Sequence, residues 1–93
     1  MTDHTPTPPN IAAPADATQT ADWRADIHGN WTRGFLGTER AVNDHQIEIE
    51  GKQFSDGHTT RVINAHALWL DADTARQLAT ALIEAADELD RLT

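Results

Sequence analysis

The last part of the chain constrains the fold most, because it specifies one long amphipathic helix. Residues 72–92 contain neither glycine nor proline and are rich in alanine and leucine, a composition that favours a helix. Either Asp71 or Asp73 can cap its N-terminus. A single helix with one apolar side must pack on another layer, which the preceding residues have to supply. The apolar residues that recur at three- and four-residue spacing are Ala75, Leu78, Ala79, Leu82, Ala85, Ala86, Leu89 and Leu92, with Ile83 beside them.

A β-hairpin over residues 45–70 is the first candidate for that layer. Ile47 and Ile49 alternate with glutamates, and Asp56-Gly57 is a strong turn signal between two apolar segments. The strands are therefore expected on either side of this dipeptide.

Two registers are open for this hairpin. A three-residue loop that ends at Gly57, in the left-handed conformation, places Ile49 opposite Ile63. A two-residue loop would instead place Ile49 opposite Asn64. We prefer the three-residue loop because it pairs apolar side chains. Gly51 is expected to be a bulge, because the apolar residues change parity after it.

A second hairpin is predicted over residues 23–36. Apolar and polar residues alternate from Trp23 to His28, and Gly29-Asn30 suits a two-residue turn. That loop places Asp26 opposite Arg33. One face then carries Trp23, Ala25, Ile27 and Leu36, and the other carries Arg24, Asp26, His28, Trp31, Arg33 and Phe35.

The N-terminal 21 residues differ from the rest in composition. All four prolines lie in residues 1–21, and Ile11 is the one large apolar residue there after Met1. Such a segment buries too little apolar area to offset its conformational entropy. We therefore predict a disordered tail over 1–21 and one α+β domain over 22–93, with two β-hairpins, up to four antiparallel strands, packed on one C-terminal helix.

Composition excludes several classes of protein. The 93 residues include no cysteine, which rules out disulfides, thiolate zinc sites and a cysteine nucleophile. The net charge of −8 opposes direct binding to nucleic-acid phosphates. No apolar run is long enough to span a membrane, and the first residues lack the pattern of a signal peptide. We expect a cytoplasmic protein.

The polar face of the first hairpin is one candidate interaction surface. Trp31 and Phe35 lie on it beside Arg24 and Arg33, and tryptophan and arginine are enriched at protein–protein hot spots. A single helix covers one face of the sheet, so this face is expected to stay uncovered unless the sheet folds over it. Trp23 and Trp69 are the tryptophans expected in the core.

The acidic side of the helix is a second candidate. Glu84, Asp87 and Glu88 lie in its C-terminal half, where the helix dipole disfavours negative charge. The plain interpretation is a solvated face. The functional one is a surface that attracts a basic partner.

No catalytic constellation stands out. His45 and His66 can approach each other across the second hairpin and would make a metal site with Asp44, although ordinary strand or loop histidines explain them far better. Ser55, Asp56 and His58 fall in a turn, where serine and aspartate form local hydrogen bonds. We therefore assign no catalytic residue, no metal and no cofactor.

A resemblance covers about half of the chain. The strand "IEIEGKQFSDG" and the helix "LDADTARQLATALIEAADELDRL" resemble a group of small actinobacterial and actinophage proteins, in which a short sheet precedes a helix of the form "ARQLAxALxEAADEL". The resemblance implies a fold and a cellular context, and it implies no activity.

These features favour a small acidic, non-enzymatic interaction module. We expect it to be phage-encoded, to bind and modulate a host protein, and to form a homodimer that supplies the missing layer. One alternative is a nucleic-acid mimic that inhibits a basic DNA-binding protein through the helix carboxylates and Glu48 and Glu50. A less favoured alternative is a metal-dependent enzyme built on His45 and His66.

Overall fold

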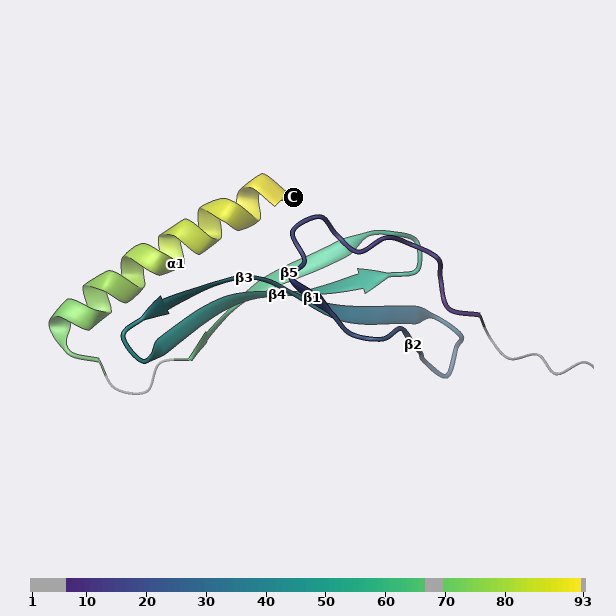
Figure 1. Ribbon diagram of the computed structural model, residues 1–93, viewed down its shortest axis with the longest axis horizontal. Coiled ribbons are helices and arrows are strands. Elements are labelled where there is room, and N and C mark those ends of the chain that lie inside the picture. The colour runs from purple at the N-terminus through teal and green to yellow at the C-terminus, as the bar shows by residue number, and fades with distance from the viewer. Residues whose placement is uncertain (1–6, 67–69, 93) are drawn as a thin grey trace, which may run out of the picture.

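The structure is a small α+β domain, as predicted (Figure 1). The computed structural model describes residues 7–66 and 70–92, so Trp69 lies outside the described residues. The strands form one antiparallel sheet in the order β1-β3-β4-β5, and β2 also pairs with β3. The elements are β1 (Gln19–Thr20), β2 (Arg24–Ala25), β3 (Trp31–Val42), β4 (His45–Phe54), β5 (Thr59–His66) and α1 (Ala72–Leu92).

The hairpin of β4 and β5 has the preferred register. Ile49 lies opposite Ile63, and Gln53 lies opposite Thr59 at the end of the ladder. The loop between the strands holds Gly57 at a φ of 94°, the left-handed conformation that glycine adopts without strain. The three-residue loop is therefore confirmed.

A further hairpin, which the sequence pattern did not predict, joins β3 to β4. Strand β3 does not end at Leu36 but continues to Val42, and the chain returns through Asn43-Asp44. Asn43 has a φ of 54°. Asparagine tolerates this conformation better than most residues, and Asn-Asp is an ordinary hairpin-turn pair. The three long strands therefore form a continuous antiparallel meander.

The sheet has its irregularity in β3, not at Gly51. The register of β3 against β4 shifts between Leu36 and Glu39, which adds one residue to β3. Gly51 pairs regularly with Phe35, whose ring lies across it. A Cβ atom at Gly51 would lie 2.2 Å from Cζ of Phe35. The glycine makes room for an aromatic ring, so the bulge predicted there is wrong.

The two faces of the sheet differ in what lies on them. Successive side chains point to opposite faces, so Ile47 and Ile49 mark one face and Glu48 and Glu50 the other. In Figure 1, helix α1 and the chain at residues 7–18, here called the N-terminal segment, both lie on one side of the sheet, which is the isoleucine side. We call this the covered face. Residues of the opposite, open face are Thr32, Gly34, Leu36, Glu39, Ala41, Gln46, Glu48, Glu50, Lys52, Phe54, Thr60, Val62, Asn64 and His66.

The core lies between α1 and the covered face. Ile47 is fully buried and packs in one cluster with Val42 of β3 and with Leu78, Ala81 and Ala85 of the helix. The small alanine side chains let the helix lie close to the sheet. The helix is turned slightly from the predicted orientation, since Ala79, Ala86 and Ile83 are exposed.

Asp71 resolves the choice of N-cap. Its Oδ1 accepts a hydrogen bond of 2.7 Å from the backbone N–H of Thr74, whereas Asp73 pairs with Arg76 on the surface. This hydrogen bond lowers the pKa of Asp71 below its ordinary value.

Candidate interaction surface

The open face carries both apolar and acidic side chains. Leu36, Glu50 and Val62 form one cross-strand row over β3, β4 and β5. Val62 is 58% exposed, and Leu36 and Glu50 are half-buried. Helix α1 packs on the other face, against Ile47.

Three carboxylates gather on this face. Glu39 and Glu48 are direct cross-strand partners, an arrangement of like charges that destabilises a sheet. The carboxylate of Glu39 accepts a hydrogen bond from Gln46, and that of Glu50 accepts one of 2.9 Å from Asn64. The nearest basic group to Glu48 is His66, at 3.9 Å. Neutral donors thus orient the carboxylates of Glu39 and Glu50 without cancelling their charge.

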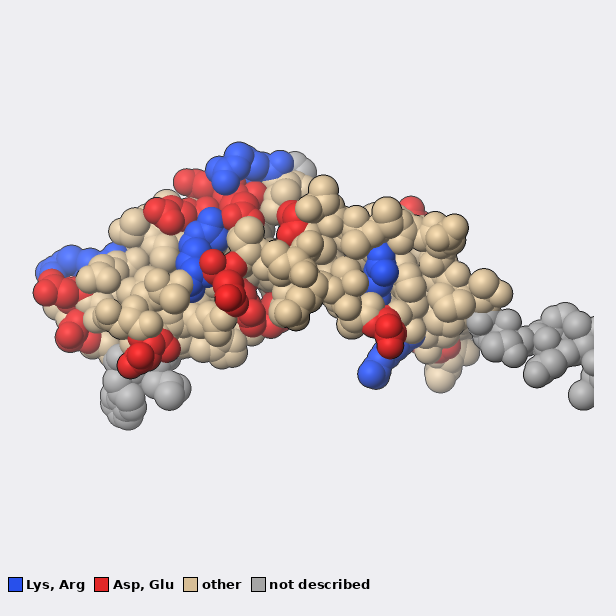
Figure 2. Space-filling view, viewed as in Figure 1, with Lys and Arg blue, Asp and Glu red and all other residues tan. Residues whose placement is uncertain are grey.

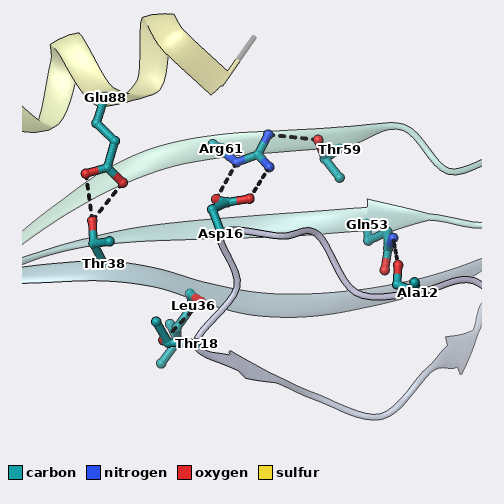
Figure 3. A network of polar contacts seen from close by, with 9 residues as sticks. All are labelled: Ala12, Asp16, Thr18, Leu36, Thr38, Gln53, Thr59, Arg61 and Glu88. Carbon is teal, nitrogen blue, oxygen red and sulfur yellow. Dashed lines mark hydrogen bonds and ion pairs between the residues drawn. The ribbon is translucent and has the colours of Figure 1, made fainter.

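The covered face is closed at its far end by the N-terminal segment (Figure 3). Asp16 accepts two hydrogen bonds from Arg61, of 2.7 and 3.0 Å, and both side chains are nearly buried. The Arg61 guanidinium lowers the pKa of Asp16. Gln53 donates to the carbonyl of Ala12 at 2.9 Å. The N-terminal segment is therefore docked on the sheet over residues 11–18, where a disordered tail had been predicted.

A second polar contact joins the helix to the sheet, also shown in Figure 3. Glu88 accepts hydrogen bonds from Thr38, at 2.8 and 2.9 Å, and from Arg40, at 2.8 Å. Burial raises the pKa of Glu88, but the hydrogen bonds from Arg40 and Thr38 lower it, and the net pKa lies below the ordinary value. Glu88 thus holds helix α1 against strand β3 through these hydrogen bonds.

The structure separates the residues predicted for the first interaction surface. Trp31, Arg33 and Phe35 all belong to the covered face, and Phe35 is only 3% exposed. Arg33 donates to the carbonyl of Ile11 and to Gln53. Arg24, by contrast, is exposed and pairs with an open-face residue. The prediction that these four side chains share an uncovered face is wrong.

The register of the first hairpin explains why Arg24 lies on the other face from Trp31, Arg33 and Phe35. Arg24 pairs with Thr32 and Ala25 with Trp31, so a five-residue connection replaces the predicted Gly29-Asn30 loop. The register slips by three residues, an odd number, and an odd slip exchanges the faces of every side chain. Trp23 consequently stacks on Arg33, 4.6 Å from its guanidinium carbon, instead of lying on the opposite face.

The acidic side of the helix is also divided. Figure 2 shows acidic side chains gathered over the half of the molecule that carries α1. Glu84 is exposed and lies 3.7 Å from Arg40, and Asp87 is exposed. Glu88, at 15% side-chain exposure, faces the sheet and is not available to a partner in this structure.

The hypothesis of a nucleic-acid mimic requires the helix carboxylates and those of Glu48 and Glu50 to lie along one surface. Glu84 and Asp87 lie on the helix, over the covered face, while Glu48 and Glu50 lie on the open face. The sheet therefore separates the two acidic rows, and they do not line up along one surface.

The histidine arrangement does not suit a shared metal ion. His66 pairs with Gln46, so His45 and His66 leave the sheet on opposite faces. Among residues 7–66 and 70–92 no three histidine, aspartate or glutamate side chains are grouped closely enough to hold a metal ion.

One signal for the open face was present in the sequence. Glu48 and Glu50 alternate with the buried isoleucines, which already assigns them to the face away from the core. Leu36 could not be assigned in this way, because its face depends on the pairing of β3 with β4.

Comparison with family models, curated proteins and solved structures finds no match to this chain. The resemblance to small actinobacterial and actinophage proteins stays a prediction. In the described part of the chain no helix is long and apolar enough to cross a membrane.

Proposed function

We propose that this chain is a small, acidic, non-enzymatic module that binds another protein in the cytoplasm through the open face of its sheet. The observation that supports this proposal is the one-sided arrangement of the fold. Helix α1 and the N-terminal segment both lie on the covered face. On the opposite face Val62 is exposed, and Leu36 and Glu50 beside it are half-buried. An exposed apolar group rimmed by polar side chains is typical of an interaction site.

In this proposal the partner is a host protein that the module modulates, and the module is phage-encoded. The resemblance to actinophage proteins supports that context. A homodimer formed through the open face is less favoured, because Glu39, Glu48 and Glu50 of two copies would face one another.

The experiment compares two substitutions of matched chemistry. Val62 on the open face and Ile83 on the outer side of the helix are similarly exposed, at 58% and 63%. Tagged wild-type protein, Val62→Glu and Ile83→Glu are used for affinity capture from an actinobacterial lysate. We expect a specific protein that Val62→Glu loses and Ile83→Glu retains. Equal capture by all three proteins, or equal loss from both variants, would reject the open face as the binding surface.

Sedimentation of the wild-type protein tests the dimer separately. A monomer at high micromolar concentration is the expected result. A dimer that Val62→Glu dissociates would assign the open face to a second copy.

A further inference from the structure

A shallow hollow lies on the open face at Gly34, which has no side chain to fill it. It has a volume of about 480 Å³, and Gly34, Leu36 and Glu50 line it together with residues 19–21 beside β3. A Cβ atom built on Gly34 would meet no atom closer than the carbonyl oxygen of Gly51, at 3.8 Å. The absence of a side chain at Gly34 therefore contributes to the hollow, and no backbone strain requires glycine there.

The ionisable side chains around this hollow are mainly acidic, with Lys52, the cross-strand partner of Gly34, as a cation on the same face. Glu50 is the one ionisable residue in its lining. A neighbouring hollow of about 290 Å³ shares Leu36 and is lined by Glu39 and Glu48. On the other side, a smaller hollow of about 240 Å³ shares Glu50 and includes Val62 and two basic residues, Lys52 and Arg61. Apolar surface at Leu36 and Val62 thus alternates with carboxylates across the strands.

We propose that the open face binds a basic segment of its partner protein, with a lysine or arginine side chain in the hollow at Gly34. This inference rests on the proposed function and names the chemistry of the partner. The methylene groups of the basic side chain lie along Gly34 and Leu36, and its cationic end reaches Glu50. Long basic side chains combine an apolar stem and a charged end in this way.

A second basic residue of the segment meets Glu39 and Glu48. Their cross-strand opposition destabilises the free protein, and a cation placed between them relieves that repulsion. Charge complementarity therefore selects a basic partner over a second, equally acidic copy of this chain.

The probe is a short capped peptide in which two lysines flank a leucine, and the control peptide has glutamates in place of the lysines. Binding to the full-length, isotope-labelled protein is followed through its amide resonances in a two-dimensional NMR spectrum. Gly34 and Gly51 report on the hollow, whereas Gly29 and Gly57 lie in turns and serve as internal references. We expect the lysine peptide to shift the first pair and leave the second unchanged.

Three variants locate the binding. Glu50→Gln keeps an oxygen that can accept the hydrogen bond from Asn64, and we expect it to bind the lysine peptide about tenfold more weakly. Gly34→Val fills the hollow and is expected to weaken binding to a similar extent. Glu84→Gln removes the same charge from the helix and serves as the matched control, with a change of less than about twofold.

The outcomes separate this inference from the proposed function. No shift at Gly34, or equal weakening by Glu50→Gln and Glu84→Gln, would reject the proposal that the open face binds a basic segment. If the basic segment is rejected but Val62→Glu still abolishes capture of the partner, the open face remains the binding surface and the partner contacts it by other chemistry. If the lysine peptide maps to the hollow but Val62→Glu and Ile83→Glu behave alike in the capture experiment, the proposed function fails.

Discussion

The guanidinium of Arg61 on β5 holds the carboxylate of Asp16 in a two-pronged ion pair that spans 45 residues of sequence. The side chains are only 7% and 12% exposed, and Arg61 also donates to Thr59 at 2.9 Å. This pair fixes the N-terminal segment over Phe35, whose ring lies 5.3 Å from the Arg61 guanidinium carbon. The segment thereby closes one end of the covered face.

Asp16→Asn is expected to destabilise the protein by about 3 kcal/mol, because it leaves a nearly buried guanidinium without its counter-charge. Urea unfolding followed by tryptophan fluorescence measures this change. Replacing both Asp16 and Arg61 by methionine leaves no unpaired guanidinium, so the double variant should be more stable than Asp16→Asn alone. An unchanged urea midpoint for Asp16→Asn would show that the segment is not held by this pair.

Gly51→Ala is expected to lower stability by about 2 kcal/mol, because its methyl group overlaps the ring of Phe35. Gly34→Ala is the control, since space is open at that position, and its effect should stay within about 0.5 kcal/mol. Thermal unfolding compares the two variants. Combining Gly51→Ala with Phe35→Leu should recover part of the loss, and a double variant with no recovery would contradict the role of the ring.

Glu88→Gln is expected to cost about 1–2 kcal/mol, because Arg40 and Thr38 lose a charged acceptor. Asp87→Asn, one position earlier and exposed, should be neutral or slightly stabilising, since it removes negative charge near the C-terminal end of the helix. Thermal unfolding followed by circular dichroism at the helix band distinguishes them. Equal effects of the two substitutions would mean that the contact of Glu88 with the sheet contributes nothing measurable.

Stability is expected to fall in acid. Asp16 and Glu88 have pKa values lowered in the folded state, so the unfolded chain binds protons at a higher pH than the folded chain. Their contribution is complete above the unfolded-state pKa values and is lost progressively between about pH 5 and pH 1 as the folded carboxylates protonate. Urea midpoints measured across this range should fall less steeply for Asp16→Asn than for the wild type. Parallel curves would exclude Asp16 as a contributor.

Local sequence was enough to predict α1 and the hairpin of β4 and β5. The helix follows from its propensity and spacing, and the hairpin from the Asp-Gly turn and the alternation at Ile47 and Ile49, all of which act over neighbouring residues. The carboxylates of Glu48 and Glu50 could likewise be assigned to the face away from the core. These interactions join residues that are close together in the sequence, so the local pattern of residues predicts them.

The identity of the uncovered face depended on contacts between distant residues. Phe35 is buried because β3 pairs with β4 so that its ring lies over Gly51, and because Asp16 reaches Arg61 above it. No periodicity encodes either contact. The sequence by itself determined that one helix covers one face of a sheet, and only the tertiary structure decided that the N-terminal segment shares that face. The contacts of Arg33 with Ile11, of Gln53 with Ala12 and of Arg61 with Asp16 hold the segment there. These contacts join residues that are far apart in sequence, so no local pattern of residues predicts them.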